Sequence, residues 1–258
     1  MRDQCANLKA EFSNYSEWFK KEVQPKSIDF PGMGPEAFDE LLRLRKLGST
    51  REQLLELSKE KMASLESDYL VELKKLTGKD SASEGEAEWL KSTPDDFEEI
   101  LDMFRKAVSA SRAFVGKVLA IDSPDSEELV IMQTPKALEA VLPSAAYLEP
   151  PRFLPTDKLI GHYYVTRPQP GVRLLEHTPG MIYNVSSHEG YPGHHLQLSW
   201  GALNKSKFRA LLSGDEFCEG WAHYCEEWMT EEGFEPVPGM QAAQLKDCLL
   251  YTSPSPRD

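Results

Sequence analysis

Residues 188–197 read His-Glu-Gly-Tyr-Pro-Gly-His-His-Leu-Gln, and this stretch decides how the chain is interpreted. It places three imidazoles and a carboxylate close together in the sequence. Four of the six histidines of the chain lie between residues 188 and 223. Neutral imidazoles bind zinc, and a carboxylate beside the metal can accept a proton from its bound water. The stretch therefore predicts a zinc site of the kind that hydrolases use.

The spacing of the histidines predicts a break in the helix that carries them. In the common zinc-binding helix the two histidines stand at i and i+4. Position i+4 from His188 is Pro192, which disfavours a continuous helix, and Gly193 loosens the backbone further. A kink or bulge there would absorb two residues and return His194 to the place of the second ligand. In an unbroken helix His195 would share the face of His188, but about 10 Å along the axis. We favour His194 and expect His195 to line the pocket or orient a ligand.

A second helix is predicted over residues 215–232, where aromatic residues recur at helical spacing. These are Phe217, Trp221, Tyr224 and Trp228, of which the last three are expected in the core. Glu219 lies 25 residues after His194, far enough for this helix to return antiparallel across the first. Glu219 and His223 stand at i and i+4 on one face, so this helix offers a third ligand. An ordinary solvated Glu–His contact is the alternative.

The two segments HEGYPGHHLQ and EGWAHYCE together resemble the domain-of-unknown-function 885 family. That family carries an H-E-x-x-P-G-H-x-x-Q signature and a later E-G-W-A motif. The resemblance extends over residues 30–247, with a helical region near its start and the stretch 142–151 before the first motif. It implies a zinc metallopeptidase of the gluzincin type that cleaves a peptide substrate.

The resemblance also implies roles for individual residues. His188 and His194 would bind Zn²⁺, with Glu219 as the third metal ligand. Glu189 would be the catalytic general base. Accessory candidates are His195, His223 and Tyr164. Two rival interpretations stay open: a metal-dependent hydrolase of another amide or an ester, and a non-catalytic helical binding module with a structural histidine cluster. A hydrolase needs an open coordination position, whereas a structural site is closed.

Helices are predicted for most of the first half of the chain. The predicted helices are residues 34–47, a long helix from a capping box at Ser49-x-x-Glu52 to about Leu76, and a helix from Thr93 to about Val118. Residues 79–88 are polar and are predicted as a loop. We expect an N-terminal helical region over residues 1–128.

The catalytic region is expected over residues 129–247 and contains the strand signals. Residues 129–132 and 160–165 read as strands between proline-rich loops. They predict a small antiparallel sheet beside the active-site helix. The predicted fold class is therefore mainly α (α+β), a helical zincin-like metallopeptidase fragment.

The ends of the chain lead to a further expectation. Residues 248–258 resemble a translated sequencing-adapter tail, and we expect them to be non-native and to pack against nothing. A natural Ser/Pro-rich tail is the alternative. On the first interpretation the chain is a piece of a longer enzyme.

Composition restricts the partners. The net charge of −13 argues against nucleic acid and anionic membrane surfaces. No stretch approaches the roughly 18 apolar residues of a membrane span. The four cysteines show no C-x-x-C spacing and no disulfide framework. The first residues lack the apolar core of a signal peptide, so the compartment stays open with the cytoplasm as the default. The oligomeric state also stays open.

Overall fold

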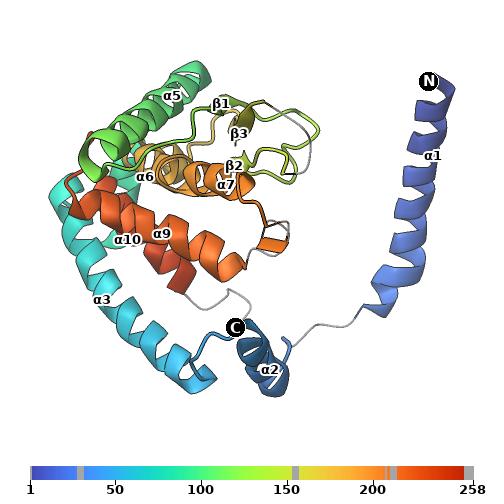
Figure 1. Ribbon diagram of the computed structural model, residues 1–258, viewed down its shortest axis with the longest axis horizontal. Helices are drawn as coiled ribbons and strands as arrows, with labels where there is room; N and C mark the ends of the chain where they lie inside the picture. The colour runs from blue at the N-terminus through green and yellow to red at the C-terminus, as the bar shows by residue number, and fades with distance from the viewer. Residues whose placement is uncertain (1, 28–31, 153–156, 207, 210–213, 253–258) are drawn as a thin grey trace. The chain divides into compact units, whose positions relative to one another are not determined.

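The structure is a computed structural model that describes residues 2–27, 32–152, 157–206, 208–209 and 214–252. Most of these residues lie in helices, and three short strands form a small sheet (Figure 1). The predicted fold class, mainly α with a small sheet, is confirmed. The chain divides into two compact units, Met1–Leu55 and Glu56–Asp258.

The first unit is built from α1 (Arg2–Trp18), α2 (Pro35–Arg45) and the start of α3 (Arg51–Thr77). A π-helical turn (Phe19–Val23) and a 3₁₀ turn (Gln24–Lys26) follow α1. Proline suits the first position of α2 because its missing N–H would be unpaired there anyway. Lys46 ends α2 in the left-handed conformation. The helix predicted over residues 34–47 is thus confirmed.

The second unit contains the rest of α3 and the helices that carry the motifs. These are α4 (Ala82–Trp89), α5 (Phe97–Phe114), α6 (Pro179–Glu189), α7 (His194–Ala202), α9 (Asp215–Glu231) and α10 (Met240–Thr252). Short turns lie at Leu90–Ser92, Val115–Leu119 and Leu175–His177.

The core of the second unit lies where α5 packs against α6. α5 buries a stripe at helical spacing, which is why this segment forms an amphipathic helix. The buried stripe consists of Phe97, Ile100, Leu101, Phe104, Ala107, Val108 and Ser111. Phe104 meets the ring of Tyr163 edge-on, with the ring centroids 5.4 Å apart. This contact joins strand β3 to α5, the helix that packs against α6.

The sheet is mixed, so the prediction of an antiparallel sheet holds for only one pair of strands. The strands are β1 (Glu127–Gln133), β2 (Ala145–Leu148) and β3 (Leu159–Val165), in the order β1-β3-β2. β2 and β3 are antiparallel, but β1 and β3 are parallel. The reason is that the chain leaves β1, passes the central position, forms β2 at the far edge and returns as β3. The segment of β2 was not predicted as a strand.

Three local predictions are corrected. Residues 82–89 form α4, not a loop, because Ser81 caps the helix by accepting the N–H of Glu84 at 3.3 Å. The capping box of α3 lies one residue later than predicted, between Thr50 and Gln53. α5 begins at Phe97 rather than after Thr93.

The expectation for the C-terminal tail is wrong in part. α10 extends to Thr252, and Leu249 packs against a second buried cluster that includes Leu73 and Trp89. Residues 253–258 lie outside the described residues, and the origin of the tail stays a prediction.

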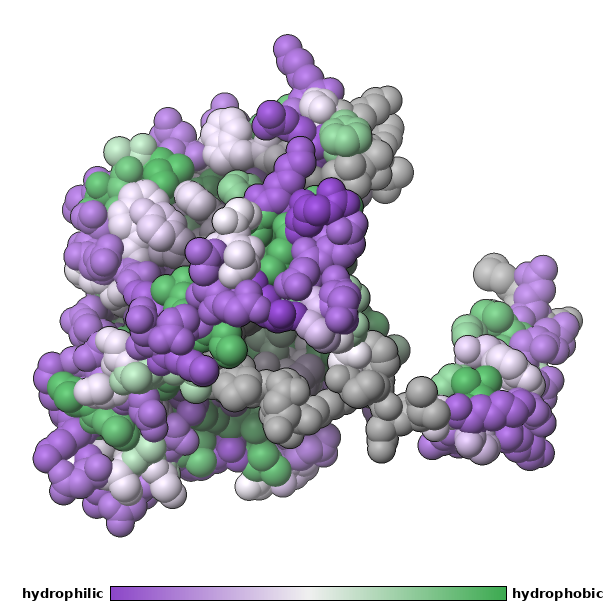
Figure 2. Space-filling view, turned by 90° about the horizontal axis from the view of Figure 1, so that it is seen from below, coloured by the Kyte–Doolittle hydropathy of each residue, from purple (hydrophilic) through white to green (hydrophobic). Residues whose placement is uncertain are grey.

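Polar and charged side chains dominate the face of the molecule seen in Figure 2. Among the described residues, none of the helices combines the length and apolar character that crossing a membrane requires. The domain boundary expected after residue 128 stays a prediction.

Candidate metal centre

The helix break between α6 and α7 brings two histidines together. α6 ends at Glu189 and α7 begins at His194, so the predicted interruption at Pro192-Gly193 is present. The Gly193 N–H donates to the carbonyl of Ser187 at 3.0 Å. The rings of His188 and His194 consequently lie edge to face, with centroids 4.7 Å apart.

Gly193 makes this close return of the backbone feasible. A Cβ at this position would lie 1.8 Å from the carbonyl oxygen of His188, which no real side chain tolerates. From α9, the Trp221 indole N–H donates to the carbonyl of Pro192 at 2.9 Å and secures the other side of the break. Hydrogen bonds to residues of α6 and of α9 thus fix the backbone at the break.

Glu219, near the start of α9, faces both histidines. Its Oε2 lies 3.5 Å from His188 Nε2 and 3.5 Å from His194 Nε2. The Glu219 side chain is 47% exposed, whereas the His188 and His194 side chains are 9% and 10% exposed. The cluster is therefore buried on the histidine side and reachable from solvent on the glutamate side.

The spacing of these atoms fits metal ligands better than a network of hydrogen bonds. Charge-assisted N–H···O bonds are about 2.7–2.9 Å long, shorter than the separations found here. Ligands held about 2.0–2.1 Å from a tetrahedral zinc ion stand roughly 3.3–3.5 Å apart. Two imidazole nitrogens and one carboxylate oxygen are also a donor set that zinc accepts. The donor chemistry and the two Glu219–histidine distances are therefore compatible with a zinc ion, and the groups close enough to hold one include His188 with Glu189 and His194, and His194 with Cys218 and Glu219.

Glu189 lies beside the same cluster. Its carboxylate and one ring nitrogen each of His188 and His194 lie within 4.8 Å of one another. Burial is the main cause that raises the pKa of Glu189 to about 7, and the charges of Glu219 and Glu226 add to it, whereas His188 opposes it. A carboxylate with a pKa near neutrality can both accept and return a proton.

Glu226, two turns beyond Glu219 on α9, orients His188 from behind. The Nδ1–H of His188 donates to Glu226 Oε1 at 2.6 Å, which leaves Nε2 facing Glu219. The amide of Asn184 donates to the other carboxylate oxygen at 2.7 Å, and His223 Nδ1 lies 3.3 Å from Oε1. Burial works against a charged His188, but in the metal-free protein the nearby carboxylates of Glu219 and Glu226 raise its pKa to about 10.

His195 points away from the cluster and enters a separate buried network. Its Nε2 lies 2.5 Å from Glu127 Oε2, which also accepts the hydroxyl of Tyr191 at 2.6 Å. Its Nδ1 lies 3.1 Å from the hydroxyl of Tyr147. Gly161 on β3 gives room for this network, because a Cβ there would lie 2.6 Å from His195 Nδ1. The structure thus places His194, not His195, beside His188.

Of the other two accessory candidates, one lies beside the cluster and one does not. His223 adjoins His188, with ring centroids 5.0 Å apart. Tyr164 stacks on His162 and lies on the β3 face opposite Gly161, so the structure does not bring it to the cluster. Tyr147 on β2 lies closer, with its ring stacked 6.5 Å from that of His194. Tyr224 is 52% exposed, which contradicts the expectation that it lies in the core.

Five residues around the cluster were not identified from the sequence: Tyr147, Asn184, Glu226, Glu127 and Asp247. Two of them had a usable signal. Asn184 precedes His188 by four residues and Glu226 follows Glu219 by seven, so each lies on the face of its helix that carries a ligand candidate. The other three come from distant segments with no recognisable motif.

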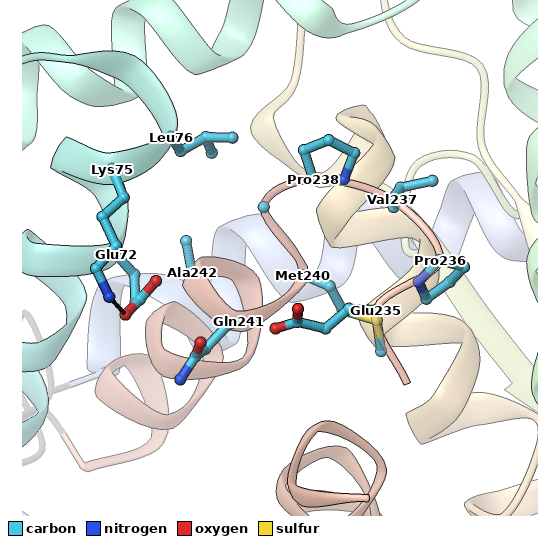
Figure 3. A pocket seen from close by; sticks show the side chains of 11 residues that line it. Glu72, Lys75, Leu76, Glu235, Pro236, Val237, Pro238, Met240, Gln241 and Ala242 are labelled. Atoms are coloured by element: carbon cyan, nitrogen blue, oxygen red, sulfur yellow. Dashed lines mark hydrogen bonds and ion pairs between the residues drawn. The ribbon is translucent and has the colours of Figure 1, made fainter. Parts of the chain in front are cut away.

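A cavity lies away from the His188–His194–Glu219 cluster, between α3 and the loop before α10 (Figure 3). It has a volume of about 560 Å³. Its lysine, Lys75, is paired with Glu72 at 2.6 Å. None of the His, Cys, Asp and Glu groups able to hold a metal within the described residues lines it. It is therefore not the candidate site.

Comparison with protein families settles the relationship of the chain. The model of a family described as "Bacterial protein of unknown function (DUF885)" matches residues 2–253. The chain belongs to the DUF885 family. The described residues within this match include three groups of side chains, sharing some members, whose ligand atoms are close enough to hold a metal ion.

The solved structures that are similar to this DUF885 chain include the crystal structure of "the putative lipoprotein from Colwellia psychrerythraea". The TM-score is 0.69 at 16% sequence identity, over 84% of this chain and 38% of that one. At this identity the similarity shows the fold alone. The chain spans 38% of the length of that structure. A comparison with curated proteins finds no match.

Proposed function

We propose that the chain carries the catalytic centre of a zinc-dependent metallopeptidase. The observation that supports this most directly is the position of Glu219 Oε2, 3.5 Å from the Nε2 atoms of both His188 and His194. The three side chains would hold the zinc ion, and Glu189 stands beside them as a base. Bound zinc would lower the pKa of a water molecule and polarise the scissile carbonyl.

The protein's own residues have separate tasks in this proposal. The Glu189 carboxylate takes the proton of the attacking water and returns it to the leaving amine. Glu226 accepts the Nδ1–H of His188, so the Nε2 lone pair of His188 is directed to the ligand position. Gly193 allows His194 to begin α7 next to the end of α6.

The half-exposed Glu219 side chain favours a catalytic site over a structural one. A structural zinc site is closed by four protein ligands, whereas a catalytic site keeps one position open. A hydrolase of another amide or of an ester would use the same groups, so the identity of the bond is part of the test.

The test separates metal binding from catalysis in the whole protein. Glu189→Gln should keep zinc and lose peptide turnover by at least about a hundredfold, because it removes the base but no ligand. His188→Ala should lose both zinc and turnover. His162→Ala, a histidine on β3 outside the cluster, should keep both. Zinc content and turnover of a peptide library are the measurements, and unchanged turnover in Glu189→Gln would refute the mechanism.

A further inference from the structure

A second, smaller cavity adjoins the proposed catalytic base. Its volume is about 180 Å³, enough for several water molecules or a short side chain. Three carboxylates reach it: Glu189 from α6, Asp247 from α10 and Glu176 from the turn before α6. Much of the remaining wall is apolar and comes from Phe104, Ala145, Met181 and Val185. The cavity is therefore lined by three acidic groups and by apolar side chains.

A buried histidine in the wall gives the cavity a polar group that lacks a hydrogen-bond partner among the described residues. His177 is fully buried, yet neither ring nitrogen has a hydrogen-bond partner among the described residues. Its ring packs edge-on against Phe104, with centroids 6.3 Å apart. Burial lowers the pKa of His177, so the ring is neutral and offers one acceptor and one N–H donor. Buried polar atoms nearly always have partners, so a ligand that donates a hydrogen bond would satisfy the acceptor nitrogen of His177.

Among the described residues these carboxylates also lack a lysine or arginine partner, although the charge of His188 acts on Glu189 and Asp247. Within the described part of the chain, no lysine or arginine forms an ion pair with Glu176, Glu189 or Asp247. Asp247 accepts a hydrogen bond from the neutral amide of Asn184 at 2.8 Å. Burial and the nearby charge of Glu226 raise the pKa of Asp247. Carboxylates close together and partly buried are stabilised by a cation more than by any neutral group.

We propose that this cavity is a binding site for the primary ammonium group of a ligand. An ammonium supplies three N–H donors and a positive charge, which match the His177 acceptor and the carboxylates. The apolar walls would contact the methylene groups behind it. Such a group occurs at the amino terminus of a peptide and at the end of a lysine side chain. Its use as a substrate subsite rests on the proposed function, but the binding of an ammonium group does not.

Binding of butylammonium, which has the size of a lysine side chain, tests the site directly. The metal-free whole protein should bind butylammonium at least about tenfold more tightly than 1-butanol, measured by calorimetric titration at pH 8. Asp247→Asn and Glu176→Gln should each weaken butylammonium binding severalfold and leave 1-butanol unaffected. Glu176 is exposed, so its variant tests the proposal even if Asp247→Asn fails to fold. The matched control is Asp125→Asn, an exposed acid outside the cavity.

Equal affinity for butylammonium and 1-butanol, or no effect of either cavity variant, would overturn the proposal. Because this titration uses metal-free protein, it succeeds or fails independently of the zinc centre. Turnover then identifies the source of the ammonium group. Acetylation of the peptide amino terminus should lower kcat/KM at least about tenfold if the site takes the α-amino group. Replacing lysine by norleucine before the scissile bond should do so if it takes the side chain.

Discussion

Glu226 shows at the scale of single residues how the proposed metal ligand His188 can be oriented by a side chain that is not itself a proposed ligand. It accepts the Nδ1–H of His188 and the amide of Asn184, and it is almost fully buried. Carboxylates that orient a metal-binding histidine typically contribute 10–100-fold to metal affinity. Glu226→Gln should therefore weaken zinc binding by about 10–100-fold, measured by competition with a chelator. Glu227→Gln, at the exposed neighbouring position, is the control and should bind zinc as the wild type does.

Asp247 is expected to make the stability of the folded protein depend on pH. Burial, followed by the charge of Glu226, raises its pKa to about 7, above the value near 4 of an unfolded aspartate. Its contribution to stability is thus fully present below pH 4 and is lost as the pH rises to 7. Asp247→Asn should remove this dependence. The free energy of unfolding of the variant relative to the wild type should rise between pH 4 and 8 by at most roughly 4 kcal/mol.

Urea unfolding of the metal-free proteins at both pH values measures this difference. Glu176→Gln, which replaces an exposed acid, should show a much smaller change. A pH-independent difference between wild type and Asp247→Asn would show that the buried carboxylate is compensated in some other way.

The residues of the candidate site that were predicted from the sequence are those of continuous motifs. His188, Glu189 and His194 lie within one decapeptide, where spacing and the helix-breaking proline already limit the geometry. Glu127 and Asp247 could not be predicted in this way. Their positions follow from how a strand and a terminal helix pack on α6 and α7, and spacing along the chain carries no trace of that packing.

At the scale of elements, the break between α6 and α7 is the feature that assembles the site. The approach of Gly193 to the end of α6 leaves no room for a side chain. Gly193→Ala should therefore destabilise the protein by about 3 kcal/mol and reduce zinc affinity. Gly201→Ala, in the same α7, meets nothing within 4 Å and should stabilise by about 0.5–1 kcal/mol. Urea unfolding and zinc titration of both variants would check this, and equal effects of the two would exclude a special role of the break.

The elements that the sequence predicted well are long and amphipathic. α3, α5 and α9 carry an apolar stripe over several turns, so their existence was clear and only their ends shifted. α4 was missed because its composition is polar and its capping signal at Ser81 is local. β2 has only four residues, and the parallel pairing of β1 with β3 depends on a connection that no local pattern encodes.

At the scale of the whole molecule, every proposed zinc ligand belongs to the second unit, Glu56–Asp258. The ligands come from α6, α7 and α9, so an ion that binds them connects three helices that unfolding would separate. An ion that binds only the folded state stabilises it by about 2.7 kcal/mol at a hundred times its Kd. For a unit of this size that corresponds to a rise in Tm of roughly 5–10 °C.

The last prediction is therefore that zinc raises Tm by this amount, and that a chain lacking residues 1–48 shows the same rise. The shortened chain keeps the capping pair of Thr50 and Gln53, so α3 still begins normally. His194→Ala should abolish the rise because it removes a ligand, whereas His162→Ala should keep it. Differential scanning calorimetry with and without zinc gives the measurement. A rise that disappears when residues 1–48 are removed would mean that the first unit contributes to the metal centre, against the assignment of all ligands to the second.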